Sequence, residues 1–225
     1  ADTAAPGRRA AVGRLEREAL EAASLVIANS RATAERLQAL YAAGREIAVI
    51  PNGVERPANM PAKDWPRAAE RIVYAGSLFP WKGASELVAA GARLAGCVIT
   101  IAGGDPAEVE TLRRQVDRNG ARVEIAGRLP GDAVRALLER SCIAVLPNRA
   151  EPNSLWSSPL KLFEYMAAGC AGVAADLPSV REALAHDEAI WVPPGDPRAL
   201  AEGIRQLADN PGKARQLGER ARARA

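Results

Sequence analysis

The chain has 225 residues, 48% of them apolar, and a formal net charge of +3. This length can bury a sizeable core in one or two domains, and the near balance of charge is typical of an ordinary soluble protein rather than of a nucleic-acid binder. No apolar run approaches the roughly 20 residues that a membrane-spanning helix needs.

Three cysteines and the placement of arginine bear on location. Cys97, Cys142 and Cys170 are widely spaced in apolar runs, which predicts buried free thiols in a reducing cytoplasm and no zinc cluster or disulfide framework. Arginines near both ends, such as those at 8–9 and 215–224, fit solvated helix faces best. A weak peripheral contact with the anionic inner face of a membrane is the minority interpretation.

The first residues form a unit of their own. We expect two helices and two strands there, namely a helix at Arg8–Ala23, a strand at Leu25–Ala28, a helix at Ala32–Tyr41 and a strand at Glu46–Ile50. Ser30 is placed to cap the second helix, and Pro51-Asn52-Gly53 indicates a turn. We assign residues 1–53 to this unit, 54–68 to a proline-rich linker and 69–225 to a second unit.

Short apolar strands and amphipathic helices alternate through the second unit. Strands are expected at Ile72–Ala75, Val98–Ala102, Val123–Ala126, Ile143–Leu146, Ala171–Ala174 and Ala189–Val192. Helices are expected between them, at Gly83–Leu94, Pro106–Arg118, Gly131–Arg140, Pro159–Ala168 and Ser179–Ala185, with a charged helix at Pro211–Ala225 to end the chain. Apolar strands joined by helices predict an α/β fold with a Rossmann-like, doubly wound parallel sheet. Ligands of such sheets bind at the carboxyl ends of the strands.

Three loops follow expected strand ends, at 76–82, 127–130 and 147–158. In the first, Gly76 would let backbone amides approach a phosphate, and Lys82 would add a positive charge. The alternative is that Lys82 merely begins a helix. Lysine is a poor choice near a positive helix N-terminus, so we expect an anion to compensate it. Gly103-Gly104-Asp105-Pro106 lacks the full dinucleotide fingerprint, and we interpret it as a turn with Asp105 as the cap.

Residues 158–172 carry the most information. Ser158 is expected to cap a helix, with Pro159 in its first position. Leu160, Phe163 and Ala167 recur at helical spacing, which predicts that they face inward. Glu164 falls on the opposite side, where a carboxylate can accept hydrogen bonds from a sugar diol. The alternative is an ordinary amphipathic helix with a solvated glutamate.

Three segments in order resemble the retaining glycosyltransferases of family GT4, the glycosyl transferases group 1, which have a GT-B fold. They are Val49–Val54, Tyr74–Gly83, and the run Ser-Pro-Leu-Lys-Leu-Phe-Glu-Tyr-Met-Ala-Ala-Gly at 158–169, followed by Asp-Leu-Pro-Ser-Val-Arg-Glu at 176–182. The resemblance implies that residues 69–225 are the C-terminal, donor-binding half of the GT-B fold. Residues 1–53 would then be the remnant of the N-terminal, acceptor domain. We therefore expect a fragment cut at both ends, which is inactive alone and whose first unit packs on the second or pairs with another copy.

The resemblance also implies roles for individual residues. Lys82 would hold the diphosphate and Glu164 the ribose, and both are expected to be essential for catalysis. The remaining donor-binding residues would be Gly76, Ser77, Gly83, Arg128, Leu129, Asn148, Glu151, Ser158, Leu160 and Lys161. Arg128 and Leu129 would meet the base, Leu160 and Lys161 would offer amides to the diphosphate, and Glu151, Asn153 or Ser154 would contact the sugar. Two departures from the family pattern stand out: Ser77 replaces a common arginine, and Trp156 replaces the first glutamate of the Glu-x7-Glu motif. With Ser77 at this position, neutralisation of the diphosphate would rest more on Lys82, helped by backbone amides and by Lys161.

The expected activity is transfer of a sugar from a UDP- or GDP-sugar, without metal or other cofactor, to an acceptor that is a glycan, a lipid-linked sugar or a small molecule. Bacterial-type cell-surface polysaccharide biosynthesis is the expected setting. Two alternatives stay open: a nucleotide-sugar epimerase or hydrolase of GT-B fold, and a degenerate GT-B module kept for protein interaction.

Overall fold

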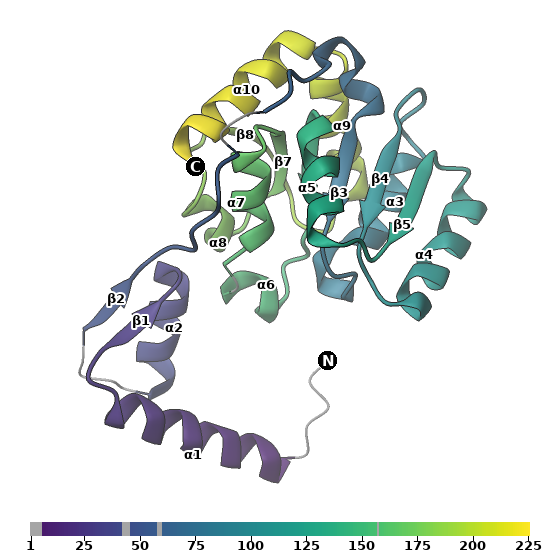
Figure 1. The fold of residues 1–225 in the computed structure, drawn as a ribbon. Coiled ribbons are helices and arrows are strands. Elements are labelled where there is room, and N and C mark those ends of the chain that lie inside the picture. Colours follow the sequence, from purple (N-terminus) through teal and green to yellow (C-terminus); the bar gives the residue numbers. More distant parts are fainter. Residues whose placement is uncertain (1–5, 42–45, 58–59, 157) are drawn as a thin grey trace.

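The computed structural model describes residues 6–41, 46–57, 60–156 and 158–225. They form two units joined by an extended segment, with the smaller, N-terminal unit at the lower left of Figure 1. None of the helices in these ranges is long and apolar enough to cross a membrane.

A six-stranded parallel sheet forms the centre of the second unit. Its strands are β3 (Ile72–Ala75), β4 (Ile99–Ala102), β5 (Val123–Gly127), β6 (Ile143–Leu146), β7 (Ala171–Ala175) and β8 (Ala189–Val192). Their spatial order is β5-β4-β3-β6-β7-β8, so the direction of winding reverses between β3 and β6. In register, Ile72 of β3 lies opposite Ile99 on one side and Ile143 on the other. The predicted doubly wound α/β fold is confirmed.

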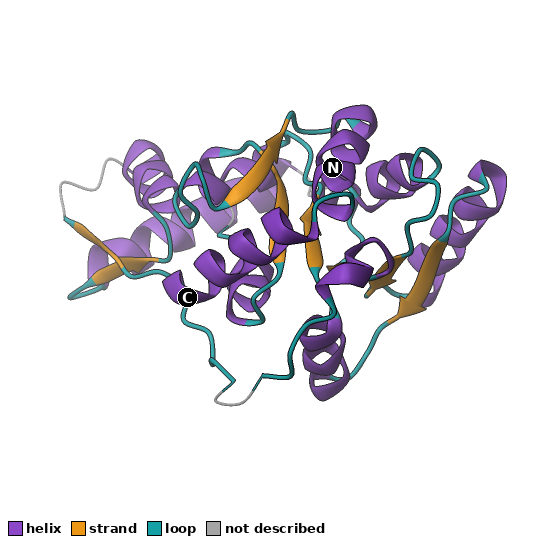
Figure 2. Ribbon diagram, turned by 90° about the horizontal axis from the view of Figure 1, so that it is seen from above, coloured by secondary structure: helices purple, strands orange, loops and turns teal. Residues whose placement is uncertain are grey.

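Helices cover both faces of this sheet (Figure 2). The helices are α3 (Ala84–Gly91), α4 (Pro106–Asn119), α5 (Gly131–Arg140), α7 (Leu160–Ala167), α8 (Pro178–Arg181), α9 (Pro197–Ala208) and α10 (Pro211–Arg224). Ile72 and Tyr74 of β3 belong to one core cluster, with side chains of α3, α4 and α9. Val73 and Ala75 belong to the other, with side chains of α5, α7 and α8. This alternation follows from the two-residue period of a strand.

The first unit contains α1 (Pro6–Ala22), β1 (Val26–Ala28), α2 (Arg31–Tyr41) and β2 (Ile47–Val49), with β1 and β2 parallel. Its buried core is small and consists of Ala28, Ala34 and Ile47. Ser30 caps α2 as predicted, since its hydroxyl accepts a hydrogen bond from the Thr33 amide at 3.0 Å.

Side-chain hydrogen bonds join the units, in addition to contacts of α2 with α8 and with the loop that follows β6. The carboxylate of Glu182, just after α8, accepts hydrogen bonds from the amides of Arg31 (2.7 Å) and Ala32 (2.8 Å) at the start of α2. The Asn52 side-chain amide donates to the Ser158 hydroxyl at 3.0 Å. The first unit therefore packs on the second, one of the two arrangements that we expected.

Between the units, residues 50–57 and 60–64 form no helix or strand, and a short 3-10 helix, η1 (Trp65–Glu70), follows them. A second one, η2 (Pro80–Lys82), precedes α3. The loop expected at 147–158 contains a further short helix, α6 (Pro152–Trp156). Cys97, Cys142 and Cys170 are buried free thiols, as predicted.

Two predictions about α7 are wrong. Ser158 does not cap the helix: Pro159 holds the N-cap position without a side-chain hydrogen bond, and the Ser158 hydroxyl bonds to Asn52 instead. The inward face was also misassigned. Leu160 is 52% exposed, whereas Lys161, Leu162, Tyr165 and Met166 are buried together with Ala167. The helix is apolar on most sides, so periodicity could not decide which side the sheet would cover.

Candidate functional site

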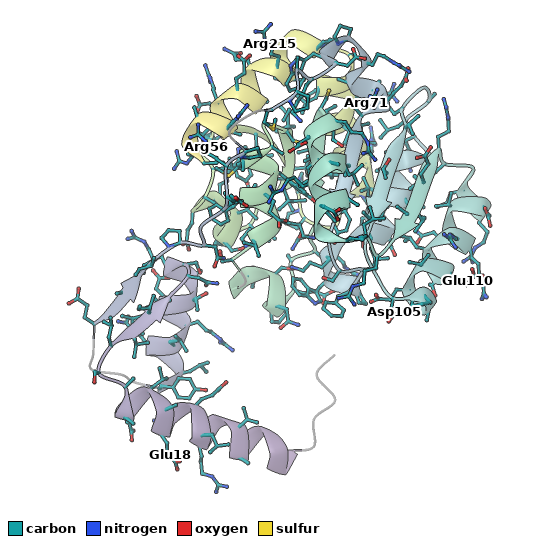
Figure 3. The ribbon with its side chains drawn as sticks, viewed as in Figure 1. Glu18, Arg56, Arg71, Asp105, Glu110 and Arg215 are labelled. Carbon is teal, nitrogen blue, oxygen red and sulfur yellow. The ribbon has the colours of Figure 1, made fainter. Side chains whose placement is uncertain are left out.

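A cleft of about 740 Å³ opens at the carboxyl ends of β3, β4 and β5, next to the point where the winding reverses. We call it the main cleft. It is lined by Ala75, Gly76, Ser77, Phe79, Ala102, Gly103, Gly104, Asp105, Pro106, Glu108, Arg128, Leu129, Val134 and Glu164. These carboxyl ends face the side on which the first unit lies in Figure 1, and Asp105 is labelled at this edge in Figure 3. Five of the predicted site residues therefore meet in one cavity, as expected for the carboxyl edge of a doubly wound sheet.

Lys82 ends η2 beside this cleft, with a side chain that is only 9% exposed. Burial lowers the pKa of its ammonium from 10.5 to about 8. The nitrogen lies 3.7 Å from the centre of the Trp81 ring, and within the described ranges no carboxylate forms an ion pair with it. A buried cation without an acidic partner is costly unless an anion joins it.

Lys161, in the first turn of α7, is a second buried lysine. Its ammonium donates a hydrogen bond to the Tyr74 hydroxyl at 2.8 Å. Burial first, and then the positive charge of Lys82, lower the pKa of Lys161 well below its ordinary value. Two buried lysines, close enough for Lys82 to disfavour a charge on Lys161, thus lie next to the loop that lines the cleft.

Two glycines of the 76–83 loop are required by close approaches. A Cβ at Gly76 would lie 2.5 Å from the Lys161 ammonium nitrogen. Gly83 has a left-handed backbone (φ 77°), and a Cβ there would lie 1.9 Å from the Pro147 carbonyl oxygen. At Gly83 only glycine lets the loop sit against the backbone at the end of β6, whereas a side chain at Gly76 would displace the end of the Lys161 side chain.

Glu164 projects from the second turn of α7 and is half-buried. Burial raises the pKa of its carboxyl group, and Lys161 lowers it. Glu164 lines the main cleft and also a smaller one of about 400 Å³ between α5, α7 and residues 53–57, which we call the side cleft. The carboxylate is thus placed to accept hydrogen bonds from a ligand that enters either cleft.

The loop after β5 forms the opposite wall of the main cleft. Arg128 is exposed there, next to Leu129.

Asp105, after β4, is the N-cap of α4 and forms a complete capping box, accepting hydrogen bonds from the Ala107 and Glu108 amides. The interpretation of Asp105 as a cap is confirmed. Its loop, at the carboxyl end of β4, also lines the main cleft, although it is not among the three loops predicted as candidates for the site.

Seven predicted site residues do not line the main cleft: Lys82, Gly83 and Lys161, which lie behind or beside its wall, and Asn148, Glu151, Ser158 and Leu160. Asn148 is 5% exposed, and its side-chain oxygen has no hydrogen-bond partner in the described part of the chain. Glu151 lies 3.4 Å from Arg149 in an ion pair. Ser158 lies at the contact between the units, and Leu160 lines the side cleft. The Leu160 amide was expected to be free for a ligand, but it donates to the Ser158 carbonyl oxygen.

Sequence reasoning missed Tyr74 and Phe79. Tyr74 is fully buried, receives the Lys161 hydrogen bond and donates one to the Ser77 carbonyl oxygen at 2.6 Å. Phe79 is 51% exposed at the cleft and stacks on Trp81. A tyrosine within the aliphatic run Ile-Val-Tyr-Ala was the available signal, because a buried hydroxyl needs a partner. Around the site, the described residues contain no group of three or more His, Cys, Asp or Glu able to hold a metal ion.

Residues 69–210 match the family model described as glycosyl transferases group 1, and residues 3–56 match that of glycosyltransferase family 4. A glycogen synthase of Mycobacterium tuberculosis is 31% identical, over 80% of this chain and 44% of its own length. A D-inositol 3-phosphate glycosyltransferase of Jonesia denitrificans is 30% identical, over 86% of this chain and 50% of its own length. The chain spans about half the length of these curated relatives.

Solved structures share the fold. Sucrose-phosphate synthase from Thermosynechococcus elongatus superposes with a TM-score of 0.81 at 25% identity, covering 99% of this chain and 59% of its own. HepE from Anabaena, in complex with UDP and glucose, gives 0.77 at 23% identity, covering 94% of this chain and 61% of its own.

Proposed function

The chain belongs to the glycosyl transferases group 1 family, and we propose that it is the donor-binding half of a retaining glycosyltransferase that uses a UDP- or GDP-sugar. The observation that carries this proposal is the pair of buried lysines, Lys82 and Lys161, next to the 76–83 loop that lines the main cleft, for which the described residues contain no ion pair with a carboxylate. Both lysines can carry their charge together only with an anion near them, and a diphosphate carries enough negative charge to compensate both.

The other predicted residues bind the remaining parts of the donor, each at a different position. Glu164 binds the ribose hydroxyls from the α7 side, and Arg128 and Leu129 contact the base from the β5 side. Gly76 and Ser77 bring backbone groups to the phosphates, because a glycine at this turn admits a close approach. These roles are supported by the common cavity that the five residues line.

The same cations assist the chemical step. When the bond between the sugar and the diphosphate breaks, negative charge develops on the leaving oxygen. Lys82, fixed against Trp81, stabilises this charge without reorganising. We propose that this arrangement makes a divalent metal unnecessary for donor binding.

The names of related proteins support the donor class. The Anabaena structures contain UDP, or UDP-glucose, and the curated relatives carry the names of sugar transferases or sugar synthases. We extend to this chain only the use of a nucleotide sugar, because it spans about half of those relatives.

Calorimetric titration with UDP, GDP and ADP in excess EDTA tests the proposal. We expect at least one of these ligands to bind, and to bind more tightly than its nucleoside. Binding that requires Mg²⁺ or Mn²⁺ would contradict metal independence. Absence of binding to all three, with and without metal, would contradict the donor site itself.

Two variants separate the roles of the residues. Lys82→Ala should weaken binding of the nucleoside diphosphate much more than binding of the nucleoside. Glu164→Ala should weaken binding of both ligands by about 1.5–3 kcal/mol, the contribution of hydrogen bonds to a charged group. Glu110→Ala is the matched control, because this exposed glutamate pairs with Arg114 on the outside of α4. Wild-type affinity in both site variants, with the fold intact, would refute the assignment.

A further inference from the structure

Lys161 has an environment that does not suit an ammonium ion. Its side chain is 9% exposed, and within the described residues its one hydrogen bond goes to the neutral Tyr74 hydroxyl. The Tyr74 ring centre lies 4.0 Å from the same nitrogen. A charge held by one neutral partner keeps most of its desolvation cost, so the empty site favours the uncharged amine.

The amine nevertheless lies directly behind the floor of the main cleft. A Cβ on Gly76 would lie 2.5 Å from the Lys161 nitrogen and 2.8 Å from the carbon next to it. Gly76 itself lines the cleft. Because Gly76 has no side chain to keep a ligand away, an anion bound against its backbone would come close enough to interact electrostatically with Lys161.

Burial and Lys82 oppose the charge of Lys161, and Glu164 only partly offsets them. Tyr74 donates its own proton to the Ser77 carbonyl oxygen, so its oxygen accepts from Lys161. From η2, Lys82 repels the ammonium, and from α7, Glu164 attracts it. Burial is the largest cause of the low pKa of Lys161, and it outweighs the attraction of Glu164.

Tyr74 is held as the neutral partner. Burial, and then the negative charge of Glu108 on α4, raise the pKa of the Tyr74 hydroxyl. The tyrosine therefore keeps its proton and offers Lys161 an acceptor without a negative charge. The hydrogen bond to Tyr74 therefore holds the Lys161 amine in position and does not require it to be protonated.

We propose that Lys161 is a second, chargeable phosphate-binding group, which is stored as a neutral amine on Tyr74 and takes up a proton from solvent when a diphosphate enters. One proton adds to the lone pair of the side-chain nitrogen, and no bond in the ligand breaks. This inference rests on the proposed function, because it assumes that the main cleft receives a diphosphate.

The test is calorimetry of UDP (or GDP, if that is the ligand that the wild type binds), near neutral pH, in two buffers of different ionisation enthalpy. The difference in heat gives the number of protons taken up. We expect the wild type to take up more protons with the diphosphate than with the nucleoside. Lys161→Met should lose part of this uptake and bind the diphosphate at least about tenfold more weakly, with the nucleoside unchanged.

A stability measurement separates this role from a structural one. Methionine fills similar space and has no proton to lose on folding, so unliganded Lys161→Met should melt at a higher temperature than the wild type. Lys161→Gln is the second variant if Lys161→Met does not fold. Tyr165→Phe is the control, because it removes another buried hydroxyl, bonded to the Ala75 backbone, and should leave proton uptake unchanged.

The outcomes distinguish a failure of the role proposed for Lys161 from a failure of the proposed donor site. If Lys161→Met binds the diphosphate with wild-type proton uptake, the inference about Lys161 is wrong and the donor site stands. If the wild type binds no nucleoside diphosphate, the proposed function fails and this inference fails with it.

Discussion

The two units treat their apolar residues differently. Seven of the nine large apolar side chains that are exposed among the described residues belong to the first unit: Val12, Leu15, Leu25, Ile27, Leu40, Val49 and Ile50. The other two, Phe79 and Leu160, line the main and side clefts of the second unit. Both units alternate strands with helices, but a two-stranded sheet with one small core cannot cover its own surface. Among the described residues, the exposed large apolar side chains of the second unit are therefore confined to the clefts, whereas those of the first unit lie in or next to each of its helices and strands.

The largest expected effect contrasts the cores. Leu87→Ala, at a fully buried position of α3, should lower the free energy of unfolding by about 2–5 kcal/mol, since it leaves a cavity. Leu25→Ala, at a side chain that is 64% exposed, should change it by less than about 0.5 kcal/mol. Urea unfolding of both variants measures this. Equal losses of stability in the two variants would mean that Leu25 is buried in solution, and the two units would then not differ in how they bury apolar side chains.

A second prediction concerns the cost of burial in the second unit. Burial lowers the pKa of Lys82 in the folded protein to about 8, from an ordinary value of 10.5. Between these values the unfolded chain binds more protons, so the stability of the wild type should rise with pH across that window. Lys82→Met removes the penalty, and should be more stable than wild type near pH 7, by at most about 3 kcal/mol.

The advantage of Lys82→Met should shrink toward pH 10. Lys213→Met is the matched control, because Lys213 is exposed on α10 and should give no such dependence. Chemical unfolding of all three proteins over this pH range provides the measurement. A Lys82→Met advantage that stays constant with pH would show that the lysine is not desolvated.

The contact between the units gives a smaller effect. Glu182→Gln weakens the hydrogen bonds to the Arg31 and Ala32 amides and removes a negative charge from the start of α2. Helix-end charges contribute about 0.3–1 kcal/mol, so amide exchange in α2 should accelerate by up to about fivefold. Glu202→Gln, an exposed carboxylate that pairs with Arg198, is the control. Unchanged exchange would mean that α2 is held by its apolar contacts alone.

The smallest effect is expected for donor binding without the first unit. None of the residues that line the main cleft precedes Ala75. A shortened chain that begins at Met60 should therefore bind its nucleoside diphosphate within about twofold of the full chain, a difference below about 0.5 kcal/mol. Calorimetry compares the two chains. A loss well beyond this would show that the first unit contributes to the site.

The order of elements and the place of the site could be predicted from the sequence. Ile72–Ala75, Ile143–Leu146 and Ala189–Val192 are strands with the predicted bounds. Apolar runs punctuated by glycine and proline are local signals, and the winding of a parallel sheet brings the loops after its strands to one edge. Gly76, Arg128 and Glu164 could therefore be assigned to a common cleft before any coordinates.

Only the tertiary structure decided which side chains meet. Lys161 was expected to offer a backbone amide, but its side chain turned inward to Tyr74, 87 residues away in sequence. Ser158 bonded across the units to Asn52, 106 residues away, and left the helix cap to Pro159. Helical periodicity tells which residues share a face of α7, but when most faces are apolar, the covered face depends on what the sheet and its loops present. The charge state of a buried lysine is set by those same neighbours, which the linear sequence does not place.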